Sequence, residues 1–209
     1  MYFNQGGAIS SLNGKPLKEV HQFVYLGGNI SSTEGDVIIR IGKAWTAIDS
    51  LSPMWRSDLS DGIKRKFFQA VVVSVLLYGC TTWTLTKRLE KKLDGTYTRM
   101  LRAVLNKSWK QHPTKQQLYG HLPPISQTIR ERRTRHAGHC WRSKDELISD
   151  VLLWTPTHGY PSVGQPAKTY IHQLCEDTDC HLEDLPHAMA DRDGWRERVK
   201  GIRANSTPR

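Results

Sequence analysis

The sequence predicts a mainly α-helical protein that begins with a short β-hairpin. Apolar residues recur at spacings of three and four over four long stretches of the chain, which is the helical period. Strand-like alternation is confined to residues 5–35, where Asn13-Gly14 is a strong turn signal. With 38% hydrophobic residues over 209 positions, the chain can build a core, so wholesale disorder is excluded.

The first expected element is a short strand that ends at Gly27-Gly28, because paired glycines favour a turn. Its apolar residues are Val20, Phe23, Tyr25 and Leu26. We assign residues 1–35 to this β-hairpin region.

Helical periodicity begins after Gly35. The apolar face of the first helix consists of Val37, Ile41, Ala44, Trp45, Ile48 and Leu51. A second helix follows the possible N-caps Ser60 and Asp61 and ends near Gly79. Its predicted buried stripe is Ile63, Phe67, Ala70, Val71, Ser74, Val75 and Tyr78.

Two further helices complete a helical basic domain at residues 36–150. The third carries Leu89, Leu93, Tyr97, Met100, Leu101 and Val104 on its apolar face. The fourth runs from Pro123-Pro124-Ile125 to about Arg142, with Ile129 and Ala137 inward and its arginines outward.

The composition changes after Trp154. Residues 155–168 contain three prolines and two glycines, so we predict a linker at 151–166. Residues 167–209 then form a loosely tethered helical tail, with one helix from Ala167 to about Cys175 and another from Pro186 to Arg203.

Positive charge is concentrated in the middle of the chain. The formal net charge is +10 and the pI about 9.6, which favours a polyanionic partner. Residues 87–144 contain 15 Lys or Arg and 3 Asp or Glu, so this stretch carries +12 and the remainder −2. We interpret the stretch as a surface for nucleic-acid phosphates. The alternative is that these side chains only coat the solvent-facing sides of helices.

Motif searches do not find a catalytic site. The chain contains no GxxxxGK[ST] phosphate loop, no HExxH zinc helix and no GxSxG nucleophile elbow. It also has no adjacent Asp-Asp pair of the kind that holds two metal ions in polymerases and nucleases. We therefore expect no catalytic residue, no cofactor and no enzyme activity from this chain on its own.

The N-terminus lacks the basic and apolar segments of a secretory signal. The longest apolar run, Phe67–Cys80, is shorter than the roughly 18 to 20 residues of a spanning helix. We therefore expect an intracellular chain, nuclear or cytoplasmic rather than secreted, with no membrane partner. Its four cysteines are then free thiols.

The weak candidates for a metal site are Cys175, Cys180, His181 and His187, whose spacing is C-x4-C-H-x5-H. Zinc sites use these ligand types. However, adjacent Cys180 and His181 are poorly placed for two corners of one tetrahedral site, and the usual C-x2-C pair is missing. We expect no metal here.

Four aromatic residues interleave the basic stretch: Tyr97, Trp109, Tyr119 and Trp141. Aromatic rings can stack on exposed bases of a nucleic acid. They also anchor helix packing, and we favour packing for these four.

Three groups of motifs occur in a fixed order along residues 9–200. The first comprises Phe23-Val24-Tyr25-Leu26-Gly27, Ile30-Ser31-Ser32 and Arg40-Ile41-Gly42-Lys43-Ala44. The second comprises Leu76 to Leu85, Leu93-Asp94 and Arg99-Met100-Leu101-Arg102. The third comprises Ile129 to Arg133, Gly138-His139, Arg142, Gly164-Gln165-Pro166 and Asp191-Arg192-Asp193-Gly194-Trp195.

In order and spacing, these motifs resemble the carboxyl-terminal region of the endonuclease–reverse transcriptase of non-LTR (LINE-type) retrotransposons, in the RTE-like and jockey-like group. The resemblance implies a primer-grip hairpin at Phe23, Tyr25, Leu26 and Gly27, then a thumb, then a post-thumb tail. It places the catalytic aspartates and the endonuclease upstream of the matching region, so this chain is expected to be a fragment without them.

As a thumb, the basic helices would hold the primer–template duplex by its phosphates, RNA or DNA, without sequence preference. The expected phosphate-binding residues are Arg99, Arg102, Lys107, Lys110, Arg130, Arg132, Arg133 and Arg135. Six to eight such contacts would give a slope of log affinity against log salt of roughly −4 to −7.

Two other interpretations stay open from the sequence. In the first, the chain is a free-standing or domesticated accessory protein that binds nucleic acid or zinc. In the second, it is a degenerate fragment without function. Departures from the family pattern are compatible with the second, since Thr81 stands where the family usually has glutamate and Gln165 where arginine is usual. A degenerate fragment would aggregate through its exposed core.

Overall fold

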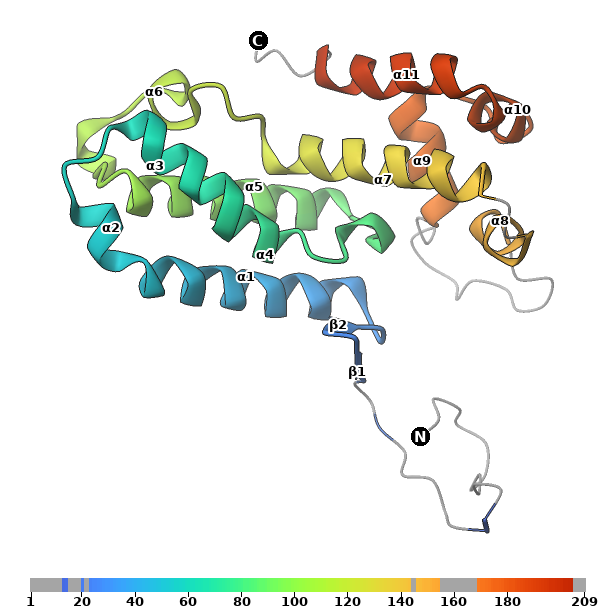
Figure 1. The fold of residues 1–209 in the computed structure, drawn as a ribbon, viewed down its shortest axis with the longest axis horizontal. Helices are drawn as coiled ribbons and strands as arrows, with labels where there is room; N and C mark the ends of the chain where they lie inside the picture. The colour runs from blue at the N-terminus through green and yellow to red at the C-terminus, as the bar shows by residue number, and fades with distance from the viewer. Residues whose placement is uncertain (1–12, 15–19, 21–22, 144–145, 155–168, 205–209) are drawn as a thin grey trace.

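The computed structural model describes residues 13–14, 20, 23–143, 146–154 and 169–204 (Figure 1). Over these residues the protein is mainly α-helical, with a two-stranded antiparallel hairpin near the N-terminus, which confirms the predicted fold class. None of the described helices has the length and apolarity needed to cross a bilayer.

The hairpin consists of β1 (Val24–Tyr25) and β2 (Gly28–Asn29). Tyr25 pairs with Gly28, so Leu26 and Gly27 alone form the turn. Both turn residues have positive φ, 47° and 81°, as the tight turns that suit twisted hairpins require. Gly28, which the sequence placed at the end of a strand, instead begins the second one.

Helix α1 (Thr33–Ser50) starts three residues earlier than the periodicity indicates. The reason is a cap: the Ser32 hydroxyl accepts a hydrogen bond from the Gly35 amide at 3.0 Å, which satisfies a free donor of the first turn. A short helix that the sequence did not reveal, α2 (Ser52–Arg56), follows at once.

The next helical segment is continuous but contains a wide turn. It is composed of α3 (Asp61–Phe67), the π-helical η1 (Phe68–Val73) and α4 (Ser74–Leu76), with Ser60 as its N-cap. Gly79, at φ 74°, follows its end as expected.

The predicted buried stripe of this segment is wrong. Phe68, Val72 and Leu76 are fully buried, whereas the predicted Ile63, Phe67 and Val71 are exposed. The segment is apolar on both sides, so periodicity does not choose between them. The π turn also adds a residue that shifts the register of the two ends.

After the turn η2 (Cys80–Thr82), the helices α5 (Lys87–Val104) and α7 (Ile125–Trp141) occur where the sequence predicts them. The short η3 (Trp109–Gln111) and α6 (Lys115–Tyr119) connect them. The Asp94 carboxylate caps the start of α7 by accepting from Ser126, while Glu90 pairs with Arg130. Helices α5 and α7 are therefore antiparallel.

The C-terminal part contains α8 (Glu146–Leu152), α9 (Tyr170–Thr178), α10 (Leu185–Ala190) and α11 (Arg192–Ala204). The single helix expected from Pro186 to Arg203 is thus two helices, because the backbone is extended at Asp191. The helix expected from Ala167 begins at Tyr170 instead. Most of the predicted linker lies outside the described residues.

Two apolar cores meet at α7. The first is built by α1, α3–α4, α5 and the start of α7. The second contains Leu174, Leu185, Met189 and Trp195, packed against Ala137 of α7. The described part of the tail is therefore not loosely tethered, because buried side chains fix it to the same helix that closes the first core.

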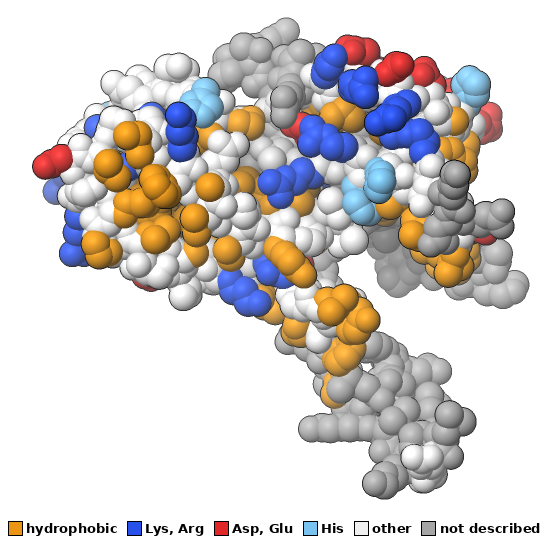
Figure 2. Space-filling view, in the orientation of Figure 1, with side chains coloured by type: hydrophobic (Ala, Val, Ile, Leu, Met, Phe, Trp, Pro, Cys, Tyr) orange, Lys and Arg blue, Asp and Glu red, His pale blue; other side chains and the backbone are white. Residues whose placement is uncertain are grey.

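Exposed apolar side chains gather in a patch on the hairpin and the outer side of the α3–α4 segment (Figure 2). Its members are Val24, Tyr25, Leu26, Ile30, Ile63, Phe67, Val71 and Tyr78. Basic side chains instead gather over α7 and α11.

Candidate nucleic-acid interface

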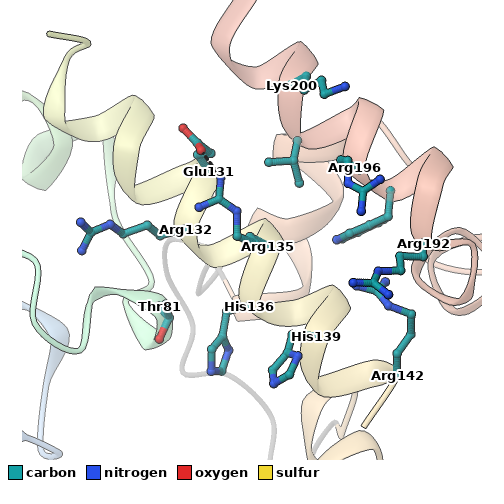
Figure 3. A pocket seen from close by; sticks show the side chains of 12 residues that line it. Thr81, Glu131, Arg132, Arg135, His136, His139, Arg142, Arg192, Arg196 and Lys200 are labelled. Atoms are coloured by element: carbon teal, nitrogen blue, oxygen red, sulfur yellow. Dashed lines mark hydrogen bonds and ion pairs between the residues drawn. The ribbon is translucent and has the colours of Figure 1, made fainter.

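A groove of about 730 Å³ runs between α7 and α11 (Figure 3). Its lining comes from three segments that are distant in the sequence: η2, the second half of α7, and α11. The lining residues are Thr81, Glu131, Arg132, Arg135, His136, His139, Arg142, Arg192, Trp195, Arg196, Val199 and Lys200.

The basic lining follows from helical spacing. On α7, Arg132, Arg135, His139 and Arg142 are three or four positions apart in turn, and His136 is four from Arg132 and three from His139, so all five share one face. On α11, Arg192, Arg196 and Lys200 are four apart and likewise share one face. The groove forms where these two faces meet, and its floor includes Trp195 and Val199.

Close packing of Trp195 on Gly138 sets the position of α11. A β-carbon at Gly138 would lie 2.3 Å from the indole nitrogen of Trp195, so only glycine admits this approach. The same nitrogen donates a hydrogen bond of 2.8 Å to the Thr134 carbonyl. Farther along, Gln127 donates to the Ile202 carbonyl at 3.1 Å, so α7 and α11 are antiparallel.

A cap and a glycine start α11. The Asp191 carboxylate accepts a hydrogen bond from the Asp193 amide at 3.1 Å, in the first turn of the helix. A β-carbon at Gly194 would lie 2.2 Å from that carboxylate. The sequence Asp191 to Trp195 therefore encodes a sharp helix start and the residue that anchors the helix.

The groove is strongly positive. Six Lys or Arg side chains line it against a single carboxylate, Glu131, among the described lining residues. Glu131 is buried and hydrogen-bonded by Arg135. The acidic residues of α11, Asp193 and Glu197, pair with Arg196 and Lys200 at exposed positions, and such surface pairs are weak enough to exchange for a phosphate.

His136 sits at the edge of this groove. Burial and the neighbouring His139 both lower the pKa of its imidazole below the ordinary value. Its Nδ1 lies 3.4 Å from the Cys140 sulfur, one helical turn on. The imidazole is therefore mainly neutral at pH 7, and the arginines supply the charge of the groove.

The prediction that Arg133 binds phosphate from the outer side of α7 is wrong. It faces inward and is only 1% exposed. Its guanidinium binds the Asp177 carboxylate at 2.5 Å, the Trp83 carbonyl at 2.9 Å and the Gln173 side chain at 2.7 Å. With these bonds made, Arg133 connects α7 to α9 and the η2 segment and has no access to a phosphate.

Arg130 lies on the same inward side and is partly engaged. It hydrogen-bonds Glu90 at 2.9 Å, and its Nε is 3.7 Å from Asp177. Burial lowers the pKa of Arg130, but the hydrogen bond and charge of Glu90, with the charge of Asp177, outweigh burial and raise it. The residue therefore serves first as an ion-pair partner between α5, α7 and α9.

Four predicted residues lie away from the groove: Arg99, Arg102, Lys107 and Lys110. In the antiparallel pair of α5 and α7, Asp94 of α5 lies opposite Ser126 of α7. From this contact, Arg102 lies farther along α5 in one direction and Arg135 farther along α7 in the other. At 1.5 Å per helical residue they are about 25 Å apart along the pair. Of the eight predicted ligands, the structure thus brings Arg132 and Arg135 into the groove and separates these four from it.

The predicted primer-grip residues form a fixed, projecting turn. The Tyr78 hydroxyl donates to the Leu26 carbonyl at 3.0 Å, and Arg40 donates to the Gly27 carbonyl. The Arg40 guanidinium also lies 4.2 Å over the Tyr78 ring. Tyr25 and Leu26 are exposed, and Phe23 is half-buried.

A buried carboxylate holds the base of this hairpin. Asp36 accepts a hydrogen bond from the Asn29 amide at 3.0 Å and another from the Trp83 indole at 2.8 Å. The first two motif groups of the sequence therefore meet in space, because Asn29 and Asp36 lie between the members of the first group and Trp83 belongs to the second.

The weak metal candidates Cys175, Cys180, His181 and His187 do not come together as a site. Among the described residues, which include all four, no group of three or more His, Cys, Asp or Glu is placed to hold a metal ion. Both cysteines are partly buried free thiols, and both histidines are exposed.

The sequence interpretation missed Arg142, Arg192, Arg196 and Lys200. It read the charge as a property of residues 87–144, although half of the groove's Lys and Arg belong to α11. The fourfold spacing of Arg192, Arg196 and Lys200 was the available signal. A linear charge count could not show that this face meets α7.

Comparison with known proteins gives no relative: no family model, no curated protein and no solved structure matches this chain.

Proposed function

We propose that this chain binds the sugar–phosphate backbone of nucleic acid in the groove between α7 and α11. This is the role expected of the thumb and tail of a non-LTR retrotransposon reverse transcriptase, which its motifs resemble. The observation that carries the proposal is the convergence of six Lys or Arg side chains from two helices on one open groove.

The arrangement favours a polymer over a small anion. Arg192, Arg196 and Lys200 span eight residues of α11, or about 12 Å along its axis. A single phosphate reaches one or two of these groups, whereas a nucleic-acid strand presents a row of charges to all of them. Arginine also suits phosphate, because its planar guanidinium donates two parallel hydrogen bonds to one anion.

Binding through this groove is independent of base sequence. Guanidinium and ammonium groups that contact phosphates position a duplex but carry no information about its bases. In the reverse-transcriptase interpretation, the duplex is a primer–template and the projecting turn at Tyr25 and Leu26 lies near the primer end.

The proposal is tested with two variants of equal charge. The groove variant replaces Arg135, Arg196 and Lys200 with alanine. The control variant replaces Lys43, Lys66 and Arg88, which are exposed on α1, α3 and α5 outside the groove. Affinity for a labelled duplex of mixed sequence is measured by fluorescence anisotropy.

We expect the groove variant to lose at least about tenfold in affinity at moderate salt, because three phosphate contacts are removed. The control variant should lose far less. Equal losses in the two variants would show that only the net charge matters and would contradict a specific groove. Circular dichroism of both variants checks that neither is unfolded.

A further inference from the structure

The four aromatic residues of the basic stretch have different environments. Tyr97 is fully buried, and Tyr119 and Trp141 are half-buried against the two cores. These three pack as the sequence interpretation favours. Trp109 differs, because it is 65% exposed although tryptophan is usually buried over most of its surface.

The loop that carries Trp109 is held firmly at its base. Asn106, in the left-handed conformation that ends the α5 region, donates to the Trp55 carbonyl at 2.7 Å. Lys107 pairs with Asp61 at 3.7 Å. The Ser108 hydroxyl then accepts from the Lys110 amide and caps the short η3. The indole is thus presented to solvent by a fixed backbone.

The charged residues that neighbour Trp109 in the sequence are all basic. Residues 99–115 contain five Lys or Arg and no Asp or Glu. They are Arg99, Arg102, Lys107, Lys110 and Lys115. Four of them are the predicted phosphate ligands that lie outside the groove: Lys107 and Lys110 belong to the loop, and Arg99 and Arg102 to the end of α5 just before it.

We propose that the loop between α5 and α6 is a second nucleic-acid site, at which Trp109 stacks on an unpaired base while Lys110 and its basic neighbours contact the adjoining phosphates. An exposed aromatic ring among cations is the arrangement that binds single strands with little sequence preference. The ligand is therefore a single-stranded segment, and the site lies about 25 Å or more from the groove along the α5–α7 pair.

This inference rests on the proposed function, because it takes nucleic acid as the partner of the chain. Three labelled probes separate the two sites: a blunt duplex, the same duplex with a single-stranded extension of about ten nucleotides, and that extension alone. Extensions are attached at the 3′ end and, separately, at the 5′ end. Affinities are measured for the full chain and for Trp109→Ala, Trp109→Phe and Trp154→Ala.

Trp154→Ala is the matched control, since Trp154 is also 65% exposed but lies beside no basic residue in the chain. We expect Trp109→Ala to weaken binding of the extended duplex and the free strand by about tenfold, with blunt duplex unchanged. Trp109→Phe should retain most of the affinity, because it keeps a ring. Trp154→Ala should change none of the three.

Salt dependence distinguishes stacking from charge. Trp109→Ala should leave the slope of log affinity against log salt for the free strand unchanged, whereas Lys110→Ala should reduce it by about 0.7. Stacking should also quench tryptophan fluorescence in the full chain, and this quenching should be absent in Trp109→Phe.

The inference is overturned if Trp109→Ala binds the extended duplex and free strand as the full chain does, or if it weakens blunt duplex equally. Failure of the groove proposal looks different: the blunt duplex is then not bound by the full chain, whatever residue 109 is. Binding of no probe at all would overturn both.

Discussion

The two sides of α7 carry the same residue type with opposite consequences. On the inward side, Arg133 is buried and fully occupied by Asp177, Gln173 and a backbone carbonyl. On the outward side, Arg132 and Arg135 face an open groove that α11 completes with three more cations. Neighbouring arginines of one helix thus have different roles. Arg133 connects elements of the fold, whereas Arg132 and Arg135 are candidate phosphate ligands.

The difference lies in the carboxylates that each side meets. Inward, α7 faces Glu90 of α5 and Asp177 of α9, which neutralise its arginines. Outward, Glu131 pairs with Arg135, and the acidic residues of α11 pair with Arg196 and Lys200, but these three cations stay exposed to solvent in the groove. Local charge density does not identify an interface, because neutralising partners come from distant parts of the chain.

The largest effect is expected on the inward side. Replacing Arg133 with methionine leaves the buried Asp177 carboxylate without its main partner, so the free energy of unfolding should fall by about 3–5 kcal/mol. Urea denaturation measures this. Arg132→Met, on the outward side, breaks no ion pair with a buried carboxylate among the described residues, so it should change stability by less than about 1 kcal/mol.

A compensating variant sharpens this prediction. Adding Asp177→Leu to Arg133→Met removes the unpaired buried charge, so most of the lost stability should return. If Arg133→Met is as stable as Arg132→Met, the distinction between the two sides of α7 is wrong.

An intermediate effect is expected where the groove is assembled. In Gly138→Ala the added methyl group overlaps the Trp195 indole, which has to move because it is buried. Overpacking of this kind costs about 1–3 kcal/mol. Displacement of α11 should also weaken duplex binding.

Gly95→Ala on α5 is the matched control, because a β-carbon there meets nothing within 4 Å. Alanine is the better helix former, so this variant should gain up to about 1 kcal/mol in unfolding free energy and keep its affinity. Gly138→Ala behaving like Gly95→Ala would mean that Trp195 does not pack as described.

The smallest effect concerns pH. The pKa of His136 is lowered in the free protein, so its imidazole gains a proton only as pH falls below its ordinary 6.5. The charged groups around it are Arg132, Arg135, His139 and Arg142 on α7, with Arg192, Arg196 and Lys200 on α11 and Glu131 at the groove wall. A bound phosphate favours the protonated form, so duplex affinity should rise a few-fold as pH falls through this region.

The sign for stability is the reverse. Because unfolding restores the higher ordinary pKa, the unfolded chain binds more protons below pH 6.5, and the fold loses stability there. His136→Gln should flatten the rise in affinity, whereas His121→Gln, exposed outside this groove, should not. An unchanged pH profile in His136→Gln would exclude this histidine from the interface.

Much of the fold was predictable because local signals are strong in the long helices. Helices α1 and α5 have clear apolar periods, the two prolines before Ile125 mark the start of α7, and Gly79 ends the α3–α4 segment as expected. The short helices α2, α6 and α8 have too few turns for a period to emerge. The buried side of α3–α4 was predicted wrongly because both sides are apolar and a π turn shifts the register.

The candidate site was predictable only in part. The basic stretch and its arginines pointed to α7, and Arg132 and Arg135 do line the groove. The burial of Arg133 depends on Asp177, which lies 44 positions away in the sequence. The contribution of α11 depends on the fit of Trp195 against Gly138. Both are tertiary contacts that no local pattern records.

The salt dependence of duplex binding tests the central claim most directly. If the six groove cations each neutralise about one phosphate, the full chain should show a slope of log affinity against log salt near −5 for a duplex. The variant lacking Arg135, Arg196 and Lys200 should show about half that slope, and the control variant lacking Lys43, Lys66 and Arg88 the full slope. A slope near zero for the full chain, or equal reductions in the two variants, would contradict a phosphate-binding groove between α7 and α11.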